Sequence, residues 1–331
     1  FTRPNIAFVT SATTTGAMGG LVGADGICQS AAAAASLPGT YRAWLSTTTG
    51  KASMRLGAGG WVRTDGLPFT NSVAELTSGT IYYPLRLDEF GNDVFTTTVF
   101  TSTTTIGTRQ LDADTCGDWT SNAGQTPAGL GTTGTATSAW TTGAYGSCGS
   151  SRRLYCFGVS ETGAAIISPP PPAARIAFVT SSTWTPGGGL PSADALCTSE
   201  AASAGLPGTF LALLTPLNTT ASSRFSTAGA PWFRVDGVQL TATPAQAFAD
   251  AYWSAPLNVT AAGAYVHDVV WSGAPALTMQ GAPGNTCLGW NSASPQSFGG
   301  IGAATDSQVA NAFGGNSELC AAAHRLYCLQ Q

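Results

Sequence analysis

The eight cysteines of this 331-residue chain form two sets of four with nearly the same spacing. Successive cysteines are 88, 32 and 8 positions apart in the first set and 90, 33 and 8 positions apart in the second. The first set is Cys28, Cys116, Cys148 and Cys156, and the second is Cys197, Cys287, Cys320 and Cys328. Spacing this regular predicts one disulfide-stabilised module that occurs twice.

Short segments outside the cysteines repeat at the same offset, which drifts only between 169 and 172 positions. The repeated texts are IAFVTS at 6–11 and 176–181, LPGT at 37–40 and 206–209, W-x-R-x-D-G at 61–66 and 232–237, and RLYC at 153–156 and 325–328. A whole module has therefore been duplicated. LPGT lies inside each module, and we interpret it as the turn that ends the first helix.

The duplication divides the chain into two modules joined by a linker. We expect module 1 at residues 1–160, a proline-rich linker at 161–174 and module 2 at 175–331. The linker contains four consecutive prolines after Ser168, and such a stretch forms a semi-rigid spacer. Each module is long enough to bury about two-thirds of its unfolded surface.

Paired cysteines form either disulfides or metal sites. Zinc sites usually contain closely spaced cysteine pairs, and the chain has no C-x-x-C and no histidine that repeats between modules. Disulfides within each module, paired alike in both, leave three connectivities open. Disulfides persist in oxidising compartments, so we expect a secreted, extracellular or cell-surface protein.

Charged residues make up only 9% of the chain, the net charge is -4 and Lys51 is the only lysine. Without a basic cluster, nucleic acid and anionic membranes are poor partners. No apolar run approaches the roughly 18 residues that span a bilayer, so we expect no transmembrane segment. A surface poor in charge repels like copies weakly, which favours self-association.

The sequence pattern of each module predicts an α+β fold. We expect a first strand at 6–10 and 176–180, and an alanine-rich helix at 24–36 and 192–204 with Ser192 as its N-cap. Further strands are predicted at 41–46 and 210–214. A second helix is predicted most clearly at 243–252, where Thr243 precedes a proline. The signal for its counterpart at 72–76 is weaker. The remaining cysteines fall in a strand-rich half.

This order of elements, together with the repeated texts quoted above, resembles the C-type-lectin-like fold, and in particular a bacterial exported, endostatin-like domain of unknown function. The resemblance implies two tandem C-type-lectin-like domains, each with two helices and a mostly antiparallel sheet. It also implies nested disulfides. Those pairs are Cys28 with Cys156, Cys116 with Cys148, Cys197 with Cys328, and Cys287 with Cys320. Function is implied weakly, because one fold hosts many functions.

Calcium-dependent lectins of this fold carry Glu-Pro-Asn or Gln-Pro-Asp and Trp-Asn-Asp triplets, whose oxygens bind Ca²⁺. The most similar segments of this chain, APLN at 255–258 and WNS at 290–292, lack the carboxylate. Module 1 nevertheless has two acidic groupings that are weak candidates for a structural Ca²⁺ site. We favour the alternative, in which these aspartates form turns in solvated loops. The groupings are Asp88, Glu89 and Asp93, and Asp112, Asp114 and Asp118. No other cofactor is expected.

Enzymatic motifs are missing from the sequence: it has no HExxH, GxSxG, P-loop or dinucleotide fingerprint. The modules share no histidine and no free thiol that would act as base or nucleophile. We interpret the repeated Arg63 with Asp65, and Arg234 with Asp236, as structural ion pairs or turns. The repeated tryptophans at 61, 119, 232 and 290 are expected in the core rather than on a sugar-stacking surface.

We therefore expect a non-enzymatic extracellular structural protein, a subunit of a surface filament, sheath or coat. The N-terminal leader occupies the place that the linker takes before module 2, so it is the hypothetical assembly element that docks head to tail on another copy. Its residues are Phe1, Thr2, Arg3, Pro4 and Asn5. The alternative is a surface adhesin, or a carbohydrate- or protein-binding module that does not use the usual calcium site, with a glycan or cell-surface protein as partner.

Overall fold

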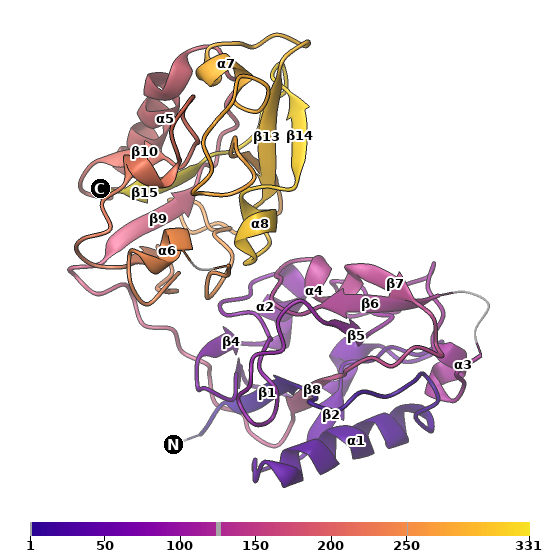
Figure 1. Cartoon of the computed structure of the whole chain (residues 1–331). Helices are drawn as coiled ribbons and strands as arrows, with labels where there is room; N and C mark the ends of the chain where they lie inside the picture. Colours follow the sequence, from indigo (N-terminus) through magenta and orange to yellow (C-terminus); the bar gives the residue numbers. More distant parts are fainter. Residues whose placement is uncertain (1, 124–126, 250) are drawn as a thin grey trace. The chain divides into compact units, whose positions relative to one another are not determined.

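The computed structural model describes residues 2–123, 127–249 and 251–331. The chain divides into two compact units, Phe1–Ile166 and Ile167–Gln331, and each is described by itself below (Figure 1). Both units mix helices with small sheets, so the fold class is α+β.

Unit 1 is built from short strands and one long helix. Its strands are β1 (Asn5–Val9), β2 (Tyr41–Ala43), β3 (Trp61–Val62), β4 (Pro68–Thr70), β5 (Thr98–Phe100), β6 (Ala128–Thr132), β7 (Ala144–Gly146) and β8 (Tyr155–Gly158). Its helices are α1 (Gly20–Ala34), the 3-10 helix η1 (Ala52–Arg55), α2 (Val73–Ser78), α3 (Cys116–Trp119) and α4 (Ala139–Thr142).

Unit 2 repeats this order, except that its described residues form no counterpart of β4. Its strands are β9 (Arg175–Val179), β10 (Phe210–Ala212), β11 (Trp232–Arg234), β12 (Val269–Trp271), β13 (Phe298–Ala303), β14 (Asn316–Leu319) and β15 (Tyr327–Gln330). Its helices are α5 (Gly189–Ser203), the 3-10 helix η2 (Ser222–Arg224), α6 (Gln246–Ala249), α7 (Cys287–Trp290) and α8 (Val309–Ala312).

The sheets of the two units have matching topology. The larger sheet has strand order β2-β8-β1-β3-β4 in unit 1 and β10-β15-β9-β11 in unit 2. The smaller sheets are β5-β6-β7 and β12-β13-β14. Pairing is antiparallel except that β1 runs parallel to β3 and β9 runs parallel to β11. The predicted antiparallel character therefore holds for most strand pairs, with one parallel pair in each unit.

The first strand of each unit separates two hydrophobic clusters. Ala7 and Val9 pack with Trp61, whereas Phe8 packs with Cys28 in the other cluster. Unit 2 does the same, because the side chains of a strand alternate between its two faces. The first strand of each unit is thus buried on both faces, which explains its uninterrupted run of apolar residues.

Helix α1 presents one apolar face to the larger sheet. Ala24, Cys28 and Ala32 are fully buried and lie four residues apart, so they share one side of the helix. In Figure 1 the helix runs along the part of the sheet that holds β2 and β8. Small alanine side chains allow this close approach, and Cys28 is placed to reach β8.

Four disulfides join the cysteines in the nested pattern. Cys28 pairs with Cys156 and Cys197 with Cys328, which links the first helix of each unit to its last strand. Cys116 pairs with Cys148 and Cys287 with Cys320. The Cα atoms are 5.4–5.7 Å apart in all four pairs, within the usual range. These bonds fit a secreted or extracellular protein.

The first helices begin earlier than expected. Helix α1 starts at Gly20 instead of residue 24, and α5 starts at Gly189 instead of residue 192. Gly20 and Gly189 adopt positive φ angles of 76° and 65°, a conformation that glycine tolerates, and the helix follows directly. Ser192 is therefore not the N-cap, and its hydroxyl donates to the carbonyl of Gly189.

The expectation for the second helices is also corrected. The helix expected at 72–76 is α2, and Ser72 is its N-cap, since Glu75 N–H donates to Ser72 Oγ. The helix expected at 243–252 is only α6, Gln246–Ala249, and residue 250 lies outside the described residues. The further short helices α3, α4, α7 and α8 exceed the expected two helices per module.

The expected linker is shorter than 161–174. Gly163 accepts from the N–H of Gly60 and donates to Arg3 O, and Ala165 is 2% exposed, so this part belongs to unit 1. At the other end, Ser168 O lies beside Gly237 of unit 2. The boundary between the units falls between residues 166 and 167, inside the predicted linker. Among the described residues, every helix is too short or too polar to cross a bilayer.

Candidate functional site

Asp88, the first calcium candidate, forms a turn. It is 3% exposed, and its carboxylate accepts from the N–H groups of Phe90 and Asn92 and from the Asn92 side chain. In unit 2 the hydroxyl of Thr260 accepts from Ala264 N–H in the equivalent turn. Because a hydroxyl replaces the carboxylate there, the role is local hydrogen bonding rather than metal binding.

The other two carboxylates of the first grouping point to separate partners. Glu89 accepts from the N–H and the hydroxyl of Ser11. Glu200 accepts from the N–H of Ser181, the counterpart of Ser11, although it comes from helix α5. Asp93 forms an ion pair with Arg86 at 2.9 Å. Each carboxylate is therefore already engaged by protein groups.

The second acidic grouping is dispersed in the same way. Asp112 accepts from the Tyr145 hydroxyl at 2.6 Å, and this bond lowers the pKa of Asp112. Asp118 accepts from the N–H and hydroxyl of Thr48. Burial raises the pKa of Asp118, but these bonds outweigh it and the pKa is lowered. Asp114 joins the sheet through its main chain, since its N–H donates to Pro127 O.

These contacts place the carboxylates in turns and ion pairs, in keeping with the turn-forming role favoured from the sequence over a structural Ca²⁺. Within residues 2–123, 127–249 and 251–331, no three His, Cys, Asp or Glu side chains gather closely enough to hold a metal ion. Proximity in the sequence did not bring these carboxylates to a common point, because each lies in its own turn or strand end.

The repeated Arg and Asp of the W-x-R-x-D-G segments form ion pairs, as predicted. Arg63 and Arg234 each contact the following Asp at 2.5 Å. Arg234 is fully buried, and it also donates to Pro256 O and Asn258 Oδ1. These bonds tie the end of the parallel strand to a distant loop, so the pair is structural.

A second repeated pair was missed in the sequence. Asp25 forms an ion pair with Arg55, and Asp194 forms one with Arg224 at 2.6 Å. Asp25 also accepts from Ala43 N–H, which fixes helix α1 against strand β2. The repeat of ASMRL at 52–56 as ASSRF at 221–225, at an offset of 169, was the available signal.

The repeated tryptophans are in the core, as predicted. All four are fully buried, and each indole N–H donates to a main-chain carbonyl: Trp61 to Gly158, Trp119 to Ser46, Trp232 to Gln330 and Trp290 to Thr215. A buried ring with a satisfied N–H is unavailable for stacking on a sugar.

The described part of the leader packs on its own unit. Asn5 is the first residue of β1 and 2% exposed, and its side chain bonds the main chain of Glu161 in both directions. Arg3 O accepts from Gly163 N–H at 2.8 Å. Phe1 lies outside the described residues. Asn5 is thus not part of an arm that reaches a second copy, and only Thr2, Arg3 and Pro4 retain exposed surface.

Unit 2 exposes apolar side chains on neighbouring segments. We call Leu217, Met279 and Leu288 the unit 2 apolar patch; they are 37%, 50% and 52% exposed. Leu217 forms a bridge with Gly281, two residues after Met279. A Cβ placed on Gly289 would lie 3.5 Å from the Leu217 side chain, so the segment that carries Leu288 is adjacent.

Unit 1 lacks an apolar side chain at two of these three positions. Thr48 stands where unit 2 has Leu217, and Gly117 and Asp118 stand where it has Leu288 and the next residue. The Thr48 hydroxyl donates to the Asp118 carboxylate at 2.6 Å. The two units therefore differ in chemistry at one corresponding surface.

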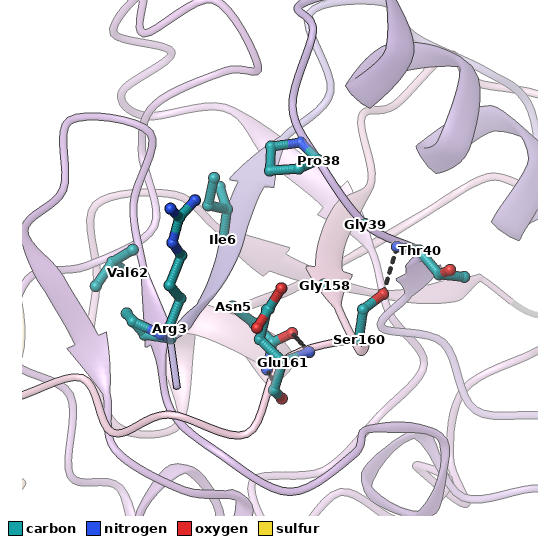
Figure 2. A pocket seen from close by; sticks show the side chains of 11 residues that line it. Arg3, Asn5, Ile6, Pro38, Gly39, Thr40, Val62, Gly158, Ser160 and Glu161 are labelled. Atoms are coloured by element: carbon teal, nitrogen blue, oxygen red, sulfur yellow. Dashed lines mark hydrogen bonds between the residues drawn. The ribbon is translucent and has the colours of Figure 1, made fainter. Parts of the chain in front are cut away.

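Unit 1 contains a cavity of about 280 Å³ at the edge of β1, β8 and the turn after α1 (Figure 2). Ile6, Pro38 and Val62 form apolar walls, and the side chain of Arg3 rises between Val62 and Ile6. The Ser160 hydroxyl accepts from Thr40 N–H on the opposite side. The Arg–Asp pairs that repeat in both modules do not line this cavity, so a comparison of the two repeats in the sequence did not reveal it.

Models of known protein families do not match this chain, and a search of curated proteins finds no relative.

Proposed function

We propose that this chain is a non-enzymatic extracellular structural protein whose copies associate head to tail into a surface filament, sheath or coat. The observation that carries the proposal is the unit 2 apolar patch, because unit 1 has Thr48 in place of Leu217 and Gly117 in place of Leu288. Surfaces that differ between the two units favour contact between unlike faces of neighbouring copies. Such heterologous contacts build filaments when their rotation does not close a ring.

Composition supports the same proposal. Charged residues are 9% of the chain, so long-range repulsion between packed copies is weak. Four disulfides suit a protein that persists outside the cell. The repeated Arg–Asp pairs and buried tryptophans serve the scaffold, which leaves the surfaces for association.

We further propose that each unit is a C-type-lectin-like, endostatin-like domain. The support is the order strand, helix, strand, then a strand-rich half, with one disulfide from the first helix to the last strand and a second disulfide inside the strand-rich half. Unit 2 repeats both disulfides. On this proposal the fold is a scaffold, and it does not by itself specify sugar binding.

Electron microscopy of the purified native protein tests the proposed assembly. We expect regular filaments or sheets at high protein concentration. Monomers at high concentration, together with binding to defined glycans on an array, would overturn the proposal and favour the adhesin.

A graft from unit 1 tests the patch itself. The variant Leu217→Thr/Leu288→Gly places the unit 1 residues in unit 2, and glycine suits the φ of 56° at position 288. We expect loss of assembly with little change in thermal unfolding. Val22→Thr, at an 85% exposed position on α1 outside the patch, is the matched control and should assemble normally. Normal assembly of the graft would exclude the patch as the interface.

A further inference from the structure

The cavity of unit 1 exists at a position where unit 2 carries an extra side chain. Gly158 and Gln330 are equivalent, since each ends the last strand of its unit and each carbonyl accepts from a buried tryptophan. Trp61 donates to Gly158 O and Trp232 donates to Gln330 O, both at 2.8 Å. Gly158 lines the cavity and has no side chain to place in it.

In unit 2 the carboxamide of Gln330 occupies the corresponding place. Its Oε1 accepts from Ile176 N–H at 2.8 Å, and its Nε2 donates to Pro207 O at 2.7 Å. The counterparts of these two residues in unit 1 are Ile6 and Pro38, and both line the cavity. Unit 2 therefore shows which chemical group fits this site: a planar amide with one acceptor and one donor.

We propose that the cavity of unit 1 binds a carboxamide side chain of a second copy of this chain, in the place that Gln330 takes in unit 2. This inference rests on the proposed head-to-tail assembly and names its receptor. A cavity of about 280 Å³ is smaller than most ligand pockets, which are roughly 300–1,000 Å³, so it suits one inserted side chain.

Gln280 is an exposed carboxamide beside the unit 2 apolar patch. It is exposed and directly follows Met279 of the unit 2 apolar patch. Inserted into the cavity, its amide would meet the Ile6 and Pro38 main chain while Met279 packs against the apolar walls. The patch and the cavity are different surfaces of the chain, as a heterologous contact requires.

Filling the cavity from within tests the receptor. Gly158→Gln copies unit 2, and a Cβ at this position meets its nearest atom, Ile6 O, at 3.1 Å, a tight contact that a small shift relieves. We expect this variant to fold and to lose assembly. Gly158→Ala, which adds the Cβ without the carboxamide, is the control and should assemble like the native protein. Equal assembly of the two variants would overturn the proposal.

Changing the inserted group tests the occupant. Gln280→Glu removes the donor for Pro38 O, and Gln280→Leu removes both polar contacts; we expect each variant to assemble at least tenfold less at equal concentration. Gln296→Leu, at an exposed glutamine outside the patch, is the matched control. Normal assembly of both Gln280 variants would exclude this residue as the occupant.

A peptide titration separates failure of this inference from failure of the proposed assembly. The acetylated and amidated peptide of residues 278–281 (TMQG) is titrated into the full chain and followed by NMR. Binding of TMQG but not of TMEG, lost in Gly158→Gln, supports the cavity even if native filaments are not seen. Binding of N-acetylglucosamine alone, or of neither peptide, would overturn the proposed occupant.

Discussion

The guanidinium of Arg234 lies 2.5 Å from the carboxylate of Asp236, and the Arg234 side chain has no exposed surface. Asp236→Asn leaves a buried cation without its counter-charge, which costs about 3 kcal/mol or more. The equivalent Asp65→Asn in unit 1 should cost less, because the Asp65 side chain is 35% exposed, against 15% for Asp236, so its ion pair is better screened by water. Chemical denaturation of both variants measures the difference. Equal costs would contradict the role of burial.

The same pair makes unit 2 sensitive to acid. Burial raises the pKa of Asp236, but Arg234, the Tyr265 hydroxyl and Val238 N–H outweigh it, so the pKa is lowered. The folded unit therefore binds a proton less readily than the unfolded chain, whose Asp titrates near about 3.9. The stabilisation is complete above about pH 5 and is lost as the pH falls toward the folded-state value.

The expected result is a stability difference between the native protein and Asp236→Asn that narrows as the pH falls from 6 to 3. Thermal unfolding across this range measures it. The native protein should lose stability more steeply than the variant, which lacks the titrating group. A difference that stays constant with pH would contradict the assignment of the acid dependence to Asp236.

The repeat made much of the scaffold predictable. Two copies of a module with nearly the same cysteine spacing and the same buried segments, such as IAFVTS, specify the first strand, the first helix and the core tryptophans. These features depend on local pattern and burial. The short helix α6 and the parallel pairs β1–β3 and β9–β11 depend on tertiary packing that no local pattern records.

The roles of charged residues were predictable only where they repeat. The structural Arg63–Asp65 pair was identified because both modules carry it. The acidic groupings were weak metal candidates because Asp88 and Asp118 are near other acids in the sequence, and only the structure shows that each has its own hydrogen-bond partners. The cavity at Gly158 exists because glycine has no side chain there. This becomes apparent only when the surroundings of Gly158 and Gln330 are compared in the structure.

The two kinds of disulfide should differ in their contribution to stability. Cys197–Cys328 closes a loop of 131 residues and Cys287–Cys320 one of 33. On the chain-entropy model the long loop contributes about 5 kcal/mol and the short one about 4 kcal/mol. Replacing Cys197 and Cys328 by alanine should therefore destabilise unit 2 more than replacing Cys287 and Cys320. Denaturant unfolding of the two double variants checks the order, and the reverse order would contradict the entropic account.

Two equivalent glycines test where the segment after the unit boundary packs. Gly66 and Gly237 both have positive φ, 83° and 97°, so alanine at either position costs about 1–2 kcal/mol of backbone strain. A Cβ on Gly66 meets nothing within 4 Å, whereas on Gly237 it would lie 1.9 Å from Ser168 O.

Gly237→Ala should consequently cost clearly more than Gly66→Ala, since the main chain at Ser168 must move away from unit 2. Calorimetry measures the two costs, and limited proteolysis reports whether the proline segment that follows Ser168 becomes easier to cleave in Gly237→Ala alone. Equal destabilisation with unchanged cleavage would show that Ser168 does not pack on this turn in solution. The expected asymmetry would instead mean that Ser168 already packs on unit 2, so the connection between the units lies before it.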